Sequence, residues 1–177
     1  SENPDLVLVR AGRTKPGYRI RWDSVLRKEQ LLLEGRLFEV DIFIDSQELI
    51  DKLFSSIKYF LFAYKNHFRT SIMMALALSY DNPVMVPTIG LMNWRTELHK
   101  CGVIYDHNSY DSFAKEFATF RENHQDYLEN ARKYYQEWFS DEAFDRCLSE
   151  FTNPQAADEL DASSNTKIVG VEIEGAE

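Results

Sequence analysis

Short apolar runs alternate with longer amphipathic stretches along the first 106 residues of this chain. The apolar runs have the length of β-strands, and they lie at 5–12, 36–45, 59–64, 84–87 and 102–106. The amphipathic stretches predict helices at 22–34, 46–57, 70–82 and 91–100. The run at 59–64 is apolar throughout, which is typical of a strand buried on both faces, so we expect it at the centre of the sheet.

The chain is expected to be helical from residue 109 to residue 151, with helices at 109–120, 124–139 and 140–151. The first of these helices carries an aromatic stripe at spacings of three and four, which we interpret as core: Tyr110, Phe113, Phe117 and Phe120. Alternating strands and helices followed by helices alone predict an α/β protein. The expected architecture is a Rossmann-like three-layer α/β/α fold with a mostly parallel sheet and C-terminal helices.

Charge separates the end of the chain from the rest. The net charge is −9, and residues 152–177 contribute −5 of it, because they contain six acidic residues and one basic residue. We interpret 1–151 as one domain and 152–177 as an acidic linker with a strand-like stretch at 166–175, whose pairing partner stays open. So acidic a chain is not expected to bind nucleic acid.

The composition also bears on the compartment and on cofactors. Cys101 and Cys147 lie far apart, lack metal-ligand spacing and flank apolar residues, so we expect two buried free thiols in a reducing cytoplasm. The sequence has no apolar run of about 18 residues, and its start lacks the pattern of a signal peptide. It contains no metal-binding motif and no P-loop, so neither a metal nor a cofactor is expected.

The stretch KYFLFAYKNHFRTSIMM joins an apolar strand to a helix through a basic, polar loop. Ligands of parallel α/β sheets bind at the carboxyl ends of the strands, and the first turn of a helix attracts anions through its free N–H groups and its dipole. The hydroxyls of Thr70 and Ser71 and the cations Lys65 and Arg69 would strengthen such a site for a diphosphate. The alternative is a capped helix that follows an ordinary solvated loop.

The order of motifs between residues 46 and 151 resembles the donor-binding segment of GT-B glycosyltransferases, and in particular that of the bacterial group 1 enzymes. The motifs that carry the resemblance are AYK at 63–65, TSI at 70–72, ALALSYDNPVM at 75–85 and TIG at 88–90. Downstream, Glu97 and the stretch CGVIYDHNSYDSFAKEF also resemble this family. One departure is Ile72, which stands where these enzymes usually have a glycine.

The resemblance implies a site for the donor, a nucleotide-diphosphate sugar that serves as substrate. The residues that it assigns to the donor diphosphate are Lys65, Arg69, Thr70, Ser71, Arg13 and Lys15. Those that it assigns to the sugar and the nucleotide are Tyr64, Gly90 and Glu97. It assigns no catalytic residue to this chain, because the base of such enzymes often belongs to an N-terminal acceptor domain.

By resemblance, the whole enzyme transfers a sugar to a glycan or lipid-linked acceptor in polysaccharide biosynthesis. The partners implied are the nucleotide sugar and the N-terminal acceptor domain, and association with the cytoplasmic face of the inner membrane would occur through that domain. The chain resembles only the C-terminal half, so we expect it to be inactive alone. Two other interpretations stay open: a non-catalytic Rossmann-like binding or interaction module, and a structural role of the aromatic helices.

Overall fold

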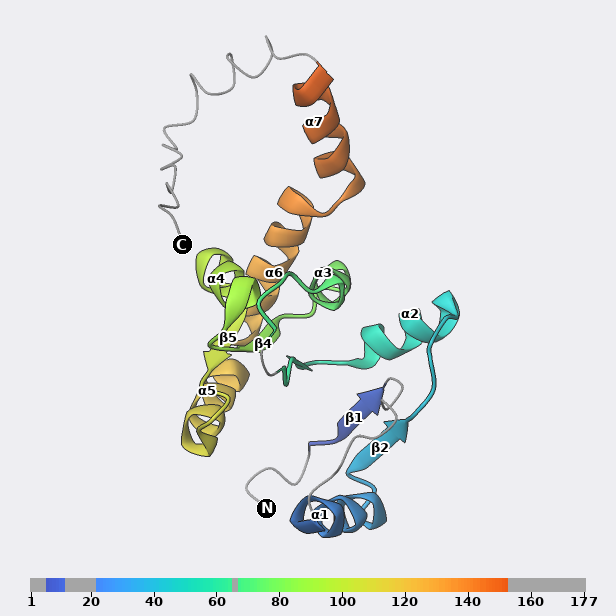
Figure 1. Cartoon of the computed structure of the whole chain (residues 1–177). Coiled ribbons are helices and arrows are strands. Elements are labelled where there is room, and N and C mark those ends of the chain that lie inside the picture. Colours follow the sequence, from blue (N-terminus) through green and yellow to red (C-terminus); the bar gives the residue numbers. More distant parts are fainter. Residues whose placement is uncertain (1–5, 12–21, 65–66, 153–177) are drawn as a thin grey trace, which may run out of the picture. The chain divides into compact units, whose positions relative to one another are not determined.

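The computed structural model describes residues 6–11, 22–64 and 67–152 (Figure 1). The strands are β1 (Leu8–Ala11), β2 (Leu37–Val40), β3 (Phe60–Leu61), β4 (Val84–Pro87) and β5 (Gly102–Tyr105). The helices are α1 (Trp22–Leu33), α2 (Gln47–Ser56), α3 (Ile72–Ser79), α4 (Gly90–His99), α5 (Tyr110–Glu122), α6 (His124–Trp138) and α7 (Asp141–Thr152). The chain divides after Ser56 into two compact units.

The first unit contains a parallel pair of strands, β1 and β2, with α1 as the connection between them. Leu8 lies opposite Leu37 in this pair. Helix α1 is followed by Gly35, which has a φ of +66°, and the N–H of Arg36 donates to the carbonyl oxygen of Leu31 at 2.8 Å. This is the usual way in which glycine ends a helix, and it returns the chain to the sheet.

The second unit contains a three-stranded parallel sheet in the order β3-β4-β5. All four residues of β4 are buried, so β4 is the central strand of this sheet among the described residues, and the prediction that 59–64 would be central is wrong there. Strand β3 has only two residues. The apolar character of the longer run at 59–64 is explained by side-chain packing. The ring centroid of Phe62 lies 5.0 Å from that of Phe60 and 5.6 Å from that of Tyr64.

Helices α3, α4, α5 and α6 pack against β4 and β5 (Figure 1). The core on the α5 side is built around Phe120, which is wholly buried with Met85, Val103 and Tyr105. Phe113 and Phe117 pack against this cluster, so the predicted aromatic stripe is confirmed for three of its four members. Tyr110 is exposed instead, because it is the first residue of α5 and precedes the part of the helix that faces the core.

The fold class is therefore confirmed: parallel strands alternate with helices, and a helical segment follows them.

The prediction that both cysteines are buried is right for one of them and wrong for the other. Cys101 is buried, and burial raises its pKa to about 12, whereas Cys147 is exposed on α7. Residues 153–177 lie outside the described part, and the assignment of 1–151 to one domain stays a prediction. Among the helices described, none combines the length and the apolar character that a membrane crossing needs.

Candidate functional site

The carboxyl ends of β3, β4 and β5 lie at one edge of their sheet, because the three strands are parallel. A short segment leads from each of these ends into α3, α4 or α5. Two hydrogen bonds tie the strand ends together. The buried hydroxyl of Tyr105 donates to the carbonyl oxygen of Phe62 at 3.0 Å, and the N–H of Thr88 donates to the carbonyl oxygen of Tyr105 at 3.0 Å. This edge is where an α/β fold of this kind binds ligands.

The start of α3 is open to solvent at this edge. Ser71 occupies the N-cap position with extended backbone angles, and its carbonyl oxygen accepts hydrogen bonds from the N–H groups of Met74 and Ala75. The next residue, Ile72, is the first of the helix and is 84% exposed. The N–H groups of Ile72 and Met73 precede the helical ladder and have no acceptor among the described residues. They offer an anion two donors at the positive end of the helix dipole.

Of the residues predicted to bind the diphosphate, Arg69 and Thr70 are exposed and directly precede this helix start. Arg69 forms no ion pair or hydrogen bond with any residue that the structure describes. Ser71 differs from them. The whole residue is only 7% exposed, and its side chain makes no capping hydrogen bond, so Ser71 offers an anion less open surface than Arg69 and Thr70 do.

The other predicted diphosphate ligands, Lys65, Arg13 and Lys15, lie outside the described residues, and their roles stay predictions. Tyr64 is partly buried, and its ring lies 4.7 Å from that of His67 with an interplanar angle of 36°. Nε2 of His67 is buried without a hydrogen-bond partner among the described residues. Sequence reasoning assigned His67 no role, and a lone histidine in a loop offers no signal that would have revealed this packing.

Gly90 begins α4 with a φ of +74°, and it lies at the same edge of the sheet because it follows β4. Glu97 lies elsewhere. It is exposed and comes seven residues later on α4, which places it about 10 Å further along the helix axis, away from this edge. The structure thus gathers Arg69, Thr70, Ser71 and Gly90 at one edge but does not bring Glu97 to it, and a donor contact by Glu97 stays a prediction.

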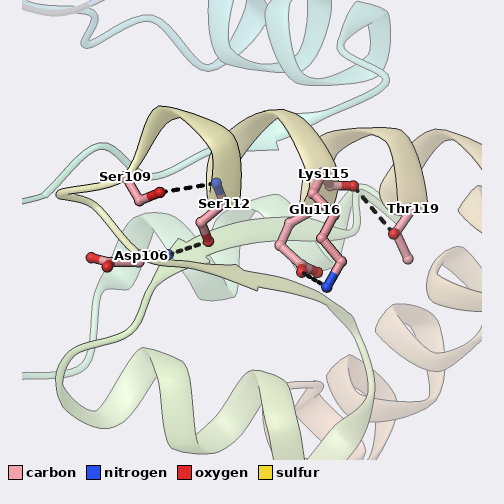
Figure 2. A network of polar contacts seen from close by, with 6 residues as sticks. All are labelled: Asp106, Ser109, Ser112, Lys115, Glu116 and Thr119. Atoms are coloured by element: carbon pink, nitrogen blue, oxygen red, sulfur yellow. Dashed lines mark hydrogen bonds and ion pairs between the residues drawn. The ribbon is translucent and has the colours of Figure 1, made fainter.

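The segment between β5 and α5 uses its polar groups to start the helix (Figure 2). The N–H of Asp106 donates to Oγ of Ser112 at 3.0 Å, and the N–H of Ser112 donates to Oγ of Ser109 at 3.1 Å. The carboxylate of Asp106 accepts from the N–H of Asn108 at 2.9 Å. These contacts are a capping network, and we assign this segment no ligand. The described residues contain no group of three or more side chains suited to a metal ion.

The fold of this chain is similar to that of the C-terminal portion of two solved GT-B glycosyltransferases. Sucrose-phosphate synthase from Thermosynechococcus elongatus matches with a TM-score of 0.58 and 13% identity, over 88% of this chain and 39% of that one. HepE from Anabaena, solved in complex with UDP, matches with a TM-score of 0.60 and 17% identity, over 90% of this chain and 42% of that one. The chain thus spans about two fifths of these proteins. No protein-family model and no curated protein matches the sequence.

Proposed function

We propose that this chain is the donor-binding domain of a glycosyltransferase that moves a sugar from a nucleotide-diphosphate sugar to a glycan or lipid-linked acceptor, in polysaccharide biosynthesis. The acceptor site and the catalytic base belong to a further, N-terminal domain in this proposal. That domain would also mediate association with the cytoplasmic face of the membrane. The chain alone would then bind the donor without transferring its sugar.

The observation that carries the proposal is the open start of α3 at the carboxyl edge of a parallel sheet. The N–H groups of Ile72 and Met73 have no acceptor among the described residues, and the exposed Arg69 and Thr70 stand beside them. Backbone amides, a hydroxyl and an arginine fork are the groups that bind a diphosphate. Negative charge grows on the diphosphate as the glycosidic bond breaks, so the same contacts would stabilise the transition state.

Titration calorimetry of the full chain with UDP, GDP and dTDP tests the proposal. We expect at least one of these nucleotides to bind, and we expect Arg69→Ala to weaken binding about 10- to 100-fold, since a charged hydrogen bond contributes about 1.5–3 kcal/mol. If none of the three nucleotides binds and none raises the melting temperature, the donor-site proposal is wrong.

Lys133→Ala is a suitable control, because it also removes an exposed cation from the same unit. Its neighbour Arg132 forms an ion pair with Asp81 at 2.7 Å, beyond the C-terminal end of α3. Lys133 therefore lies towards the opposite edge of the sheet from the start of α3. Equal losses of affinity in Arg69→Ala and Lys133→Ala would indicate a general charge effect and would contradict a site at Arg69.

A second candidate function, an interaction module without transfer, is favoured by the apolar side chains at the same edge. Phe68, Ile72, Leu91 and Trp94 are all exposed there or on the adjoining turns of α4. A protein partner would bury such side chains, whereas a diphosphate makes no use of them. The nucleotide titration distinguishes the two functions, because an interaction module predicts no binding of any nucleotide.

A further inference from the structure

Gly90 is in contact with the backbone of the loop that leads into α3. A Cβ built on Gly90 would lie 2.6 Å from the carbonyl oxygen of His67 and 2.7 Å from Cα of Phe68. Both distances are shorter than any ordinary carbon contact. The atoms concerned belong to the main chain, so no rotation of a side chain can relieve the clash. The loop backbone therefore occupies the space that any other residue at position 90 would need.

A hydrogen bond holds the loop in this place. The N–H of Leu91, in the first turn of α4, donates to the carbonyl oxygen of Phe68 at 3.2 Å. First-turn N–H groups normally lack an acceptor, so the loop supplies one here. The starts of α3 and α4 at this edge therefore differ. The start of α4 is occupied by the protein's own backbone, whereas that of α3 is open.

The anchored residue, Phe68, directly precedes Arg69 and Thr70. Arg69 is covalently joined to Phe68, and consecutive Cα atoms are about 3.8 Å apart, so we expect a shift of the Phe68 backbone to move Arg69 as well. A displacement of about 1 Å is enough to degrade a binding geometry that depends on aligned hydrogen bonds. The contact between Gly90 and the loop thus controls where the cation and the hydroxyl stand relative to the amides of α3.

We propose that Gly90 is a positioning residue: by lacking a side chain, it lets the 67–68 backbone rest on α4 and so holds Arg69 and Thr70 at the open start of α3. This inference rests on the proposed function, and it deepens it. In this role Gly90 acts through the loop and does not itself have to contact the donor.

The test compares Gly90→Ala with Gly35→Ala in the full chain. The two glycines have similar positive φ angles, +74° and +66°, so alanine is strained at both. Only Gly90 faces the loop, because a Cβ on Gly35 would have nothing within 4 Å. We expect Gly90→Ala to weaken binding of the tightest of UDP, GDP and dTDP about tenfold or more, and Gly35→Ala to leave it unchanged.

A double-mutant cycle separates positioning from a general loss of stability. If Gly90 acts through Arg69, the Arg69→Ala change should cost much less affinity in the Gly90→Ala background than in the wild type. If Gly90→Ala does not fold, Leu91→Pro takes its place, because it removes the N–H donor to Phe68 at a position in the first helical turn where proline is tolerated.

Each outcome decides a specific point. If the wild type binds a nucleotide and Gly90→Ala binds it with the same affinity, the positioning role is wrong and the proposed function stands. The same holds if the effects of Gly90→Ala and Arg69→Ala on affinity are fully additive. Absence of binding by the wild type would overturn the proposed function, and this inference with it. Reduced affinity in Gly90→Ala together with a smaller Arg69 effect would support both.

Discussion

The described residues form two parallel sheets, and packing and charge contribute differently to them. In the second unit, the central strand β4 is buried along its whole length, and Phe120 packs against the sheet from α5. In the first unit, all four residues of β1 are exposed, and so is Phe38 on β2. Parallel sheets are usually covered on both faces, so β1–β2 departs from the common pattern.

Ion pairs join the strands and helix α1 of the first unit. Arg10 lies opposite Glu39 across the two strands, and their side chains form an ion pair at 2.7 Å. Lys28, from α1, forms a second ion pair with the same carboxylate. The hydrogen bond from Lys28 is the main cause of a lowered pKa of Glu39, to which Arg10 adds. Exposed ion pairs contribute little to stability, so we expect the first unit to be the less stable of the two.

This difference bears on the site. A ligand site needs loops held by a rigid scaffold, and the open start of α3 belongs to the unit whose central strand is buried. The buried hydrogen bond between Tyr105 and Phe62 fixes the strand ends from which the loop departs. The first unit lacks comparable burial in its sheet, and none of its described residues is assigned to the donor.

The largest expected effect comes from removing a large side chain at each sheet, which tests whether the second unit is held by buried packing and the first is not. Phe120→Ala should lower the free energy of unfolding by about 3–5 kcal/mol, because it leaves a cavity in a closed core. Phe38 is 55% exposed, so Phe38→Ala should cost less than about 1 kcal/mol. Equilibrium unfolding in urea measures both. If Phe38→Ala proves as costly as Phe120→Ala, the β1–β2 face is buried in solution and the comparison fails.

The next largest effect is expected where β4 and β5 approach each other. Gly102 lies opposite Val84, and a Cβ on Gly102 would collide with the backbone carbonyl of Val84. Gly102→Ala should therefore force the strands apart and cost about 1–3 kcal/mol. Val9→Ala, at an exposed position of β1, should stay within about 0.5 kcal/mol of the wild type.

Hydrogen exchange identifies the strands affected by Gly102→Ala. The N–H of Val84, which donates to the carbonyl oxygen of Cys101 at 3.1 Å, should lose protection. Unchanged protection there would mean that the strand pair absorbs the methyl group without moving, contrary to the geometry.

Features that depend on neighbours in the sequence could be predicted from it. The serine caps of the last helices are examples, because Oγ of Ser109 accepts from the N–H of Ser112, and Oγ of Ser140 accepts from the N–H of Ala143. The exposed Arg69 beside the start of α3 is another local feature. The alternation of strands and helices likewise follows from periodicity along the chain, which is why the fold class was predictable.

Features that depend on contacts between distant segments could not be predicted. The apolar run at 59–64 predicts a central strand, but its rings pack along the chain, and among the described residues β4 is the central strand of the sheet β3-β4-β5. The contact between Gly90 and the 67–68 backbone joins segments more than 20 residues apart, and no local pattern indicates it. The exposure of Cys147 depends in the same way on which face of α7 meets the rest of the unit.

The smallest expected effect concerns Glu39 and depends on pH. The pKa of Glu39 is lowered from its ordinary value of 4.5 in the folded chain, so the unfolded chain binds the proton more tightly. The stabilisation by its ion pairs is therefore present above about pH 4.5 and is lost as the pH falls through the lower, folded value. Glu39→Gln should cost less than about 1 kcal/mol at pH 7 and should remove this part of the acid sensitivity.

Hydrogen exchange of the Leu8 N–H, which donates to the carbonyl oxygen of Arg36 at 2.9 Å, reports on the β1–β2 unit in a pH series. Glu122→Gln on α5 is the control, because it removes an exposed carboxylate from the other unit. Protection of Leu8 should fall with acid in the wild type and in Glu122→Gln, but less in Glu39→Gln. An equal acid response in all three proteins would show that these ion pairs contribute nothing to β1–β2, so that its stability would have to come from apolar contacts, as in β3–β5.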